Sequence, residues 1–314
     1  MSDVGKYASG PDAAVVIVNY QTPALVARCL ELVARSCPEL ELETVIVDNG
    51  SDDGSVERLR NEAPEANVIA MESNCGFAAG VNTGFRHTVA DLVVLLNPDT
   101  EVRENAIQSL LERLREHPHT GVVAPLLESP DGQLAPNGYR RFPNLLTVSV
   151  GFCVPLTYVL SYVPALHPDA MSPAALLAGR DPAHVTGAAL AIRREAFDAA
   201  GPFDEGFFLY LEETEWQRRV AGSGWGIEIV PHARVCHLVR GGGDGALAPS
   251  PYSVGSSLRY LRMRGVPTII SRIVIAAALV SSLATLRLIW CIPSKRVKAA
   301  AQISAYRSLL RELL

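Results

Sequence analysis

LVVLLNPDT, the stretch from Leu92 to Thr100, decides the fold class of this chain. Its first five residues are all apolar, as in a strand that is buried on both faces of a parallel sheet. The strand ends in Asn97-Pro98-Asp99, and open α/β sheets bind their ligands beyond the carboxyl ends of their strands. The stretch therefore predicts an α/β fold with a ligand site close to Asp99.

Strand and helix signals alternate on both sides of this stretch. We expect a buried strand at 13–18, further strands at 44–47, 68–71 and 121–124, and helices at 23–35, 54–62, 77–88 and 104–116. This alternation predicts a Rossmann-like, mostly parallel sheet with helices on both faces. From 126 to 184 prolines break the pattern repeatedly, which predicts an irregular insertion before a strand at 185–192 and a helix at 194–200.

Length and composition are those of a well-packed protein. The 314 residues suffice for one large α/β domain with an appendage, and the 48% of hydrophobic residues provide its core. The six cysteines form no CxxC pair, so reduced thiols are predicted and a zinc site is not. Residues 1–12 are polar and predict a flexible tail without a signal peptide, hence a cytoplasmic protein.

Charge is distributed unevenly along the chain. Residues 256–314 carry +9 and the remainder −14, within a net charge of −5. Basic residues around the apolar run Ile273–Leu286, with Trp290 near its edge, are typical of a helix on an anionic membrane surface, so nucleic acid is not expected as a partner. The run is shorter than the ~20 apolar residues that span a bilayer, which favours interfacial or shallow insertion. The alternative is a soluble helix packed on the α/β domain or on a second subunit.

Two aspartates lie at the carboxyl ends of predicted strands. Asp99 offers the oxygen ligands that Mg²⁺ or Mn²⁺ prefers, and these ions often take one or two ligands from protein while phosphates complete the shell. Asp48, in the stretch 47–51, can accept hydrogen bonds from the base or ribose of a nucleoside. The alternatives are a turn residue after Pro98 for Asp99 and a helix N-cap cluster for Asp48.

The stretch from Asn74 to Gly84 places backbone amides at a predicted helix start, where a diphosphate or ribose can bind. It matches neither GxGxxG nor a Walker loop, which counts against a dinucleotide enzyme. Gly80 and Gly84 allow a close backbone approach, either to a ligand or to the sheet that the helix crosses.

A second acidic stretch, EETE, begins a predicted helix at Glu212. The aromatic residues around it provide an apolar wall that desolvates a carboxylate and raises its basicity toward that of a general base. Helical spacing groups four side chains on one face and points Glu213 to another side; the four are Glu212, Glu215, Trp216 and Arg219. An enzyme that moves a sugar from a nucleotide needs one carboxylate to hold the metal–diphosphate and another to act as base.

Taken in order, these segments resemble the family 2 inverting glycosyltransferases with the GT-A fold, most closely the rhamnosyltransferase-like branch. The resemblance runs from about Ala13 to Gly243. The segments that carry it are 18–22, 47–51, 74–84, 96–100, 186–188, 201–219 and His237.

The resemblance implies a role for each matching position. Asp48 binds the base of the nucleotide with Asn19 and Tyr20 alongside, and Asp99 with His237 holds Mg²⁺ or Mn²⁺. Glu213 matches the catalytic base, with Glu212 as a rival for that role. Further contacts to the nucleotide-sugar are implied for Asn74, Gly76, Asn82, Asn97 and Gly187, and support of the base or acceptor for Glu215, Trp216 and Arg219. Asn97 replaces the first carboxylate of the DxD motif, and the base is Glu where the family often has Asp.

The expected reaction is inverting transfer of L-rhamnose from dTDP-rhamnose to a polyprenyl-diphosphate-linked or other cell-envelope glycan, on the inner face of the membrane. The alternatives are a UDP-galactofuranose or UDP-N-acetylglucosamine donor, a small-molecule acceptor with the basic tail serving a homodimer, or a non-catalytic sugar-nucleotide-binding protein. The expected domains are 13–255, divided at about 125 into nucleotide-binding and acceptor-binding parts, and a helical membrane-associating segment at 256–314.

Overall fold

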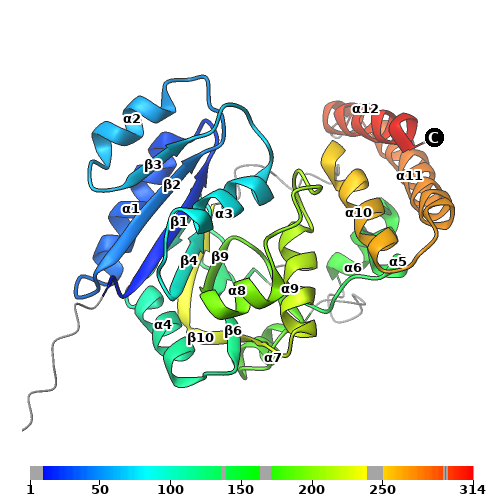
Figure 1. Ribbon diagram of the computed structural model, residues 1–314. Coiled ribbons are helices and arrows are strands. Elements are labelled where there is room, and N and C mark those ends of the chain that lie inside the picture. The colour runs from blue at the N-terminus through cyan, green and yellow to red at the C-terminus, as the bar shows by residue number, and fades with distance from the viewer. Residues whose placement is uncertain are drawn as a thin grey trace, which may run out of the picture.

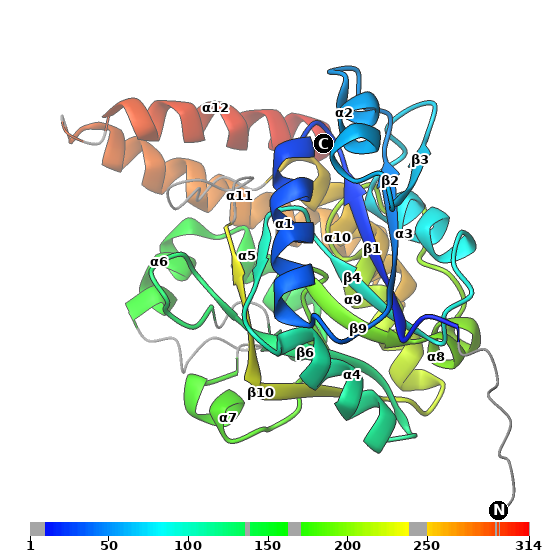
Figure 2. The same cartoon turned by 90° about the vertical axis from the view of Figure 1, so that its left-hand side faces the viewer.

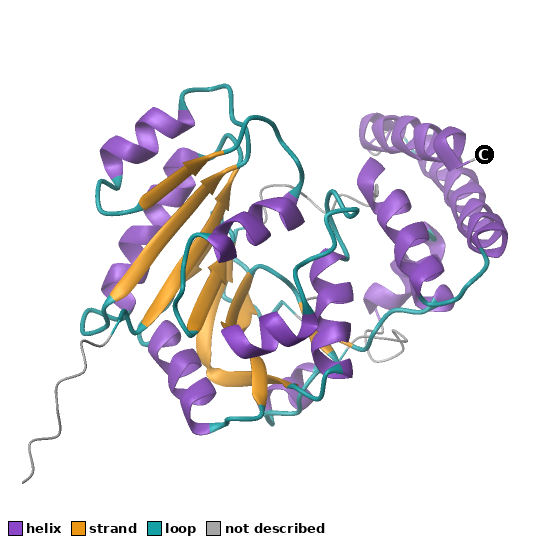
Figure 3. Ribbon diagram, in the orientation of Figure 1, coloured by secondary structure: helices purple, strands orange, loops and turns teal. Residues whose placement is uncertain are grey.

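The strands that the sequence predicts lie, together with two that it does not predict, in one eight-stranded sheet with helices on both faces (Figure 1). The computed structural model describes residues 10–135, 139–162, 171–238, 250–292, 294 and 296–313, so most of the predicted N-terminal tail lies outside the described residues. A second group of elements, made of helices, lies beside the sheet (Figure 3).

The strands are β1 (Ala13–Asn19), β2 (Leu42–Asp48), β3 (Asn67–Ala70), β4 (Leu92–Leu96), β5 (Thr100–Val102), β6 (Thr120–Glu128), β7 (Tyr139–Arg140), β8 (His184–Val185), β9 (Ala189–Arg193) and β10 (Gly226–His237). The helices are α1 (Pro23–Ser36), α2 (Ser55–Glu62), α3 (Phe77–Arg86), α4 (Ala106–Glu116), α5 (Leu145–Gly151), α6 (Val154–Tyr162), α7 (Pro173–Leu177), α8 (Arg194–Ala200), α9 (Glu212–Gly222), α10 (Pro251–Met263), α11 (Thr268–Trp290) and α12 (Arg296–Leu313).

The order of the large sheet is β3-β2-β1-β4-β9-β6-β10-β5. Its first four strands are parallel, β9 is antiparallel to β4 and β6, and β10 is parallel to β6 and antiparallel to β5. Helices α1 and α4 cover one face and α3, α8 and α9 the other (Figures 1 and 2). The predicted mostly parallel α/β sheet is therefore confirmed, and the carboxyl ends of β1, β2 and β4 share one edge.

Close packing of α3 on β1 explains two of the glycines in the stretch 74–84. A Cβ atom on Gly80 would lie 2.5 Å from Cγ1 of Val18, and one on Gly84 would lie 2.3 Å from Cγ1 of Val16. The close approach that the glycines permit is thus to the sheet, and any larger side chain would push α3 away from β1.

The region from 126 to 184 is more helical than its prolines suggest. Pro155 and Pro173 lie in the first turns of α6 and α7, where a helix loses nothing from a missing N–H. The predicted strand at 185–192 is divided into β8 and β9 by a turn at 186–188, and β5 was not predicted because it has three residues.

Helices α5, α6, α10, α11 and α12 form what we call the helical unit, with an apolar core of its own. Phe152 and Val154, from the insertion, belong to the same apolar core as Leu279 and Leu283 of α11. Ser282 of α11 donates a hydrogen bond to the Phe152 carbonyl at 2.7 Å and accepts one from the Val154 amide at 2.8 Å. The insertion and the C-terminal helices thus share one core, and the expected domain boundary at 255/256 falls inside α10.

Helix α11 is longer than the apolar run from which it was predicted, because it continues through Arg272 and Arg287. With 23 residues it is, within the described part of the chain, the helix long and apolar enough to cross a membrane by length and composition. In its most apolar window 39% of the residues are buried within the protein. The prediction that this segment is too short to span therefore does not hold for the helix as a whole.

Candidate active site

The ends of β1 and β2 are joined by a buried pair of side chains. The register of the two strands places Asn19 opposite Asp48, and Asn19 Nδ2 donates to Asp48 Oδ2 at 2.7 Å. The second oxygen of Asp48 accepts from the Ser51 amide at 2.8 Å, and the residue has no exposed surface. Tyr20, 45% exposed, presents its ring to solvent beside this pair. Because Asp48 is fully buried, a nucleotide base can contact it only if the surrounding side chains move, whereas Tyr20 is directly accessible.

A network of asparagines fixes the loop that precedes α3. Asn49 Nδ2 donates to Asn74 Oδ1 at 3.0 Å and to the Gly76 carbonyl at 3.1 Å, and its Oδ1 accepts from the Cys75 amide. Gly76 has a positive φ of 88°, and a Cβ there would lie 2.4 Å from the Phe208 carbonyl oxygen. The sequence had not singled out Asn49, although it directly follows Asp48.

The first amide of α3 is already used within the protein. Phe77 N donates to the Phe208 carbonyl at 2.9 Å. Asn82, on the same helix, is buried and exchanges hydrogen bonds with the backbone of Phe203 at 2.9 Å in both directions, and it donates to Glu205 at 2.8 Å. In this structure α3 is therefore tied to the loop before α9, and Asn82 faces that loop.

Asp99, which follows β4, and His237, the last residue of β10, lie side by side. The antiparallel pairing of β5 with β10 places His237 opposite Thr100, and its Nε2 lies 3.2 Å from Asp99 Oδ1. The Leu238 amide also donates to the Asp99 carbonyl at 2.9 Å. Within the described residues no three His, Cys, Asp or Glu side chains gather into a metal cluster. One carboxylate beside one imidazole fits an ion whose remaining ligands are phosphates and water.

Asn97 connects this pair to the turn that contains Gly187. Its amide donates to the Ala188 carbonyl at 2.9 Å, and its carbonyl accepts from the Thr100 amide at 3.2 Å. The backbone of the Asn97–Asp99 triplet is thereby fixed beside residues 186–188.

The chain enters α9 through two strained residues. Tyr210 and Leu211 have positive φ angles of 71° and 67°, a conformation that costs a residue with a side chain roughly 1–2 kcal/mol. The turn brings Glu213 against Gly187, where a Cβ on the glycine would lie 3.3 Å from the Cβ of Glu213 and 3.7 Å from the ring of Phe77. Glu213, Gly187 and the start of α3 thus converge.

Two carboxylates in the first turn of α9 lack a full set of partners. Glu212 is buried and Glu213 is half-buried, and in both the Oε2 atom is buried without a hydrogen-bond partner among the described residues. Burial raises the pKa of Glu213 although nearby backbone N–H groups oppose the shift. Burial also raises the pKa of Glu212, and the adjacent Glu213 charge raises it further. Both carboxylates therefore have raised basicity, and Glu213 is the more exposed of the two side chains.

Residues 14–199 match the family model described as glycosyl transferase family 2. The chain belongs to this family. The predicted resemblance is confirmed, and with it the expectation that the protein is a hexosyltransferase-type glycosyltransferase.

Curated relatives of this glycosyltransferase include the N-acetylglucosaminyl-diphospho-decaprenol L-rhamnosyltransferase of Mycobacterium tuberculosis, 27% identical over 71% of this chain and 75% of the relative. The low-salt glycan biosynthesis hexosyltransferase Agl10 of Haloferax volcanii is 25% identical over 65% of this chain and 60% of its own length.

Two solved glycosyltransferase structures share the fold. GalNAc-T7 with UDP, GalNAc and Mn²⁺ superposes with a TM-score of 0.58 at 19% identity, over 83% of this chain and 49% of that protein. The mannosyltransferase PcManGT from Pyrobaculum calidifontis with GDP-Man and Mn²⁺ gives 0.55 at 16% identity, over 96% and 86%. These neighbours confirm the predicted GT-A-like architecture.

In this glycosyltransferase the residues expected to support the base hold α9 in place. Arg219 Nε binds Glu215 at 3.0 Å, and its guanidinium also donates to the Pro202 carbonyl at 2.8 Å. Trp216 donates to the Gly201 carbonyl at 3.0 Å and stacks on Phe203 with ring centroids 4.7 Å apart. Glu215 and Trp216 are fully buried, so they act on α9 from within the protein.

A Glu212→Gln variant should be more stable than the wild-type glycosyltransferase at high pH and equally stable at low pH. A group whose pKa is raised on folding contributes stability that is lost as pH rises through the folded-state value, and glutamine removes that loss. Thermal unfolding midpoints at about pH 4, below the ordinary pKa of a glutamate, and at about pH 8 test this. An equal difference at both pH values would show that the effect is not electrostatic.

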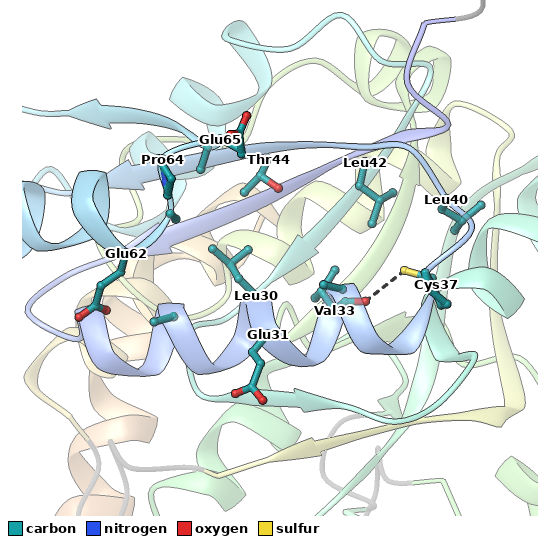
Figure 4. A pocket seen from close by; sticks show the side chains of 15 residues that line it. Leu30, Glu31, Val33, Cys37, Leu40, Leu42, Thr44, Glu62, Pro64 and Glu65 are labelled. Carbon is teal, nitrogen blue, oxygen red and sulfur yellow. Dashed lines mark hydrogen bonds between the residues drawn. The ribbon is translucent and has the colours of Figure 1, made fainter.

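A pocket of about 540 Å³ lies elsewhere, between α1 and the β2–β3 side of the sheet (Figure 4). Leu42 and Thr44 of β2 line it, together with Leu30 and Val33 of α1. These β2 residues precede the carboxyl end that carries Asp48, so the pocket is separate from the active site.

Proposed function

We propose that the protein transfers a sugar from a nucleoside diphosphate to a hydroxyl group, with inversion, and that Glu213 is the general base. The acceptor oxygen forms its bond to the anomeric carbon while the bond to the diphosphate oxygen breaks, and Glu213 Oε2 takes the hydroxyl proton. The observation that carries this proposal is the buried, unpartnered Oε2 of Glu213, in a side chain whose Cβ and Cγ pack beside Gly187 near the start of α3.

Asp99 and His237 would hold the divalent cation. Their side chains lie 3.2 Å apart at the sheet edge, and Mn²⁺ accompanies the nucleotide in both structural neighbours. A bound Mg²⁺ or Mn²⁺ supplies positive charge for the departing diphosphate. The protein's own contribution is to fix the two ligands through the β5–β10 pairing and the Asn97 turn.

For the donor we propose dTDP-L-rhamnose, and for the acceptor a glycan linked to polyprenyl diphosphate. The support is the Mycobacterium tuberculosis relative, whose name gives a rhamnosyl transfer to a decaprenol-diphosphate-linked N-acetylglucosamine. Metal-dependent release of nucleoside diphosphate, assayed across dTDP-, UDP- and GDP-sugars, tests both the class and the donor. Release from dTDP-rhamnose supports the proposal, release from another donor replaces the sugar, and binding without release under any acceptor condition would contradict catalysis.

We further propose that the helical unit lies on the cytoplasmic face of the membrane. Apolar side chains are exposed where α11 meets α12, with Leu288 74% and Val297 87% exposed, and Trp290 is 42% exposed. Next to them is a groove of about 660 Å³ lined by Arg287, Arg307 and Arg311. Arginines beside exposed apolar side chains match the charge and polarity of an anionic bilayer surface. Because the opposite face of α11 is buried in the helical unit, we favour an interfacial position over a span.

A Leu288→Glu and Val297→Glu double variant should weaken binding to phosphatidylglycerol-containing vesicles at least about tenfold, since burying such side chains is worth about 1.5–3 kcal/mol each. Co-sedimentation measures the bound fraction. The matched control is Val89→Glu, because Val89 is 91% exposed on the α/β domain. Equal loss of binding in the control, or none in the double variant, would contradict this surface. Point substitutions are preferable to deleting the tail, which would open the core shared with α5 and α6.

A further inference from the structure

The segment that leads into the base is held from two sides. It runs from Phe203 to Leu211, and we call it the 203–211 segment. On one side α3 holds it through Asn82 and through the hydrogen bond from Phe77 to the Phe208 carbonyl. On the other side lies α10, beside the loop that runs into α9 (Figure 1).

Arg259 makes the main contact from α10. Its guanidinium binds Asp204 in a bidentate manner, with Nη2–Oδ1 at 2.7 Å and Nε–Oδ2 at 3.1 Å. It also lies over the ring of Phe207 at 5.3 Å from the centroid. Gly206 makes room for it, because a Cβ there would be 2.2 Å from the guanidinium carbon. The Asp204 carboxylate, the Phe207 ring and Gly206 together form a site that fits the planar guanidinium of arginine.

Two further contacts connect α10 to the part of the 203–211 segment that is nearer to α9. Ser256 Oγ donates to the Leu209 carbonyl at 2.8 Å, and the rings of Tyr252 and Phe208 stack at 4.5 Å. Leu209 immediately precedes Tyr210 and Leu211, the two residues with positive φ. A strained backbone persists only where its surroundings hold it, and here α10 supplies part of those surroundings.

The opposite charges of Arg259 and Asp204 also stabilise the contact between α10 and the 203–211 segment. Burial raises the pKa of Asp204, but the hydrogen bonds and charge of Arg259 outweigh it and hold that pKa below its ordinary value. Asp204 is therefore ionised at neutral pH, as its bidentate contact with Arg259 requires.

We propose that Arg259 is a positioning residue for the base: it fixes the 203–211 segment and thereby the place of Glu213, so that the helical unit is a working part of the catalytic site. The inference rests on the proposed role of Glu213. Arg259 acts on the base through the 203–211 segment, whereas Asp99 and Asp48 are held by β5, β10, β1 and β2. Loss of the Arg259 contact should therefore lower kcat and leave the KM for the donor unchanged.

The test compares Arg259→Lys and Asp204→Asn with the wild type. Lysine keeps the charge but cannot form the bidentate fork. We expect kcat per folded molecule to fall ~10-fold in each variant, as a displaced base requires, and no further in the double variant. Arg262→Lys is the matched control, because Arg262 is an exposed arginine of the same helix that forms no ion pair with the described residues.

Hydrogen exchange supplies a readout that does not depend on turnover. The Glu215 amide donates to the Leu211 carbonyl at 2.9 Å and reports on the first turn of α9. It should exchange faster in Arg259→Lys than in the wild type or in Arg262→Lys. Unchanged exchange, a changed donor KM at constant kcat, or faster exchange at constant kcat would each overturn the proposal. Faster exchange in a protein that transfers no sugar would retain the positioning of α9 and overturn the proposed function instead.

Discussion

Replacing Glu213 with glutamine is expected to lower the rate of sugar transfer by about 10²–10⁴-fold, the usual contribution of a general base. Glutamine has nearly the same shape but cannot accept the proton of the acceptor hydroxyl. Glutamine can keep the buried position of the side chain and its packing against Gly187, so folding and donor binding should persist. Steady-state transfer with a saturating acceptor, together with calorimetric donor binding, measures the two effects separately.

Glu212→Gln is the matched control for this experiment. It removes the neighbouring carboxylate of the same turn, which also has a buried Oε2 without a partner. A loss of activity in Glu212→Gln with a normal rate in Glu213→Gln would assign the base to Glu212. Product analysis by NMR, which distinguishes the anomers, should show inversion in the wild type. Retention would contradict the single displacement.

Asp99→Asn should have the second-largest effect, a loss of about 10²–10³-fold, comparable with removing one strong electrostatic contact to a leaving group. The amide keeps the size of the side chain but loses the charge that attracts a divalent cation. The concentration of Mn²⁺ needed for half-maximal rate should rise in Asp99→Asn and in His237→Gln, and chelation should abolish transfer by the wild type.

Asp91→Asn provides the matched control. Asp91 is exposed and directly precedes β4, so it lies at the other end of the strand that leads to Asp99. Its replacement should change neither the rate nor the dependence on Mn²⁺. If Asp99→Asn left both unchanged, the Asp99–His237 pair would not be the metal site.

A strand can be predicted from the sequence alone where its own residues are apolar enough to indicate burial. β1 and β4 are entirely buried and entirely apolar up to their last residues, so periodicity alone locates them. β5 was missed because its three residues pair only with β10, more than 130 positions later, and local pattern contains no signal for such pairing. That pairing is what brings His237 to Asp99, and before the structure the pair rested on family resemblance alone.

The two glutamates of α9 show a similar limit. Helical periodicity separates the face of Glu212 from that of Glu213, but it does not show that Glu213 packs against Gly187, which comes from a distant part of the chain. The prolines of the insertion predicted irregular structure, but Pro155 and Pro173 lie in the first turns of helices there. No pattern in the sequence indicates that Arg259 binds Asp204, because the total charge of the basic tail does not distinguish one of its arginines from another.

The shared core of the helical unit has a consequence for synthesis on the ribosome. Ser282 and its partner Phe152 are 130 residues apart, so at about 5–20 residues per second the apolar faces of α5 and α6 emerge on the order of ten seconds before α11 exists. During that interval the nascent chain exposes Phe152 and Val154 with nothing of its own to cover them. A chaperone or the membrane surface can cover these side chains in the meantime. A chain that reaches the bilayer during translation would already be at the surface where we propose that the finished enzyme works.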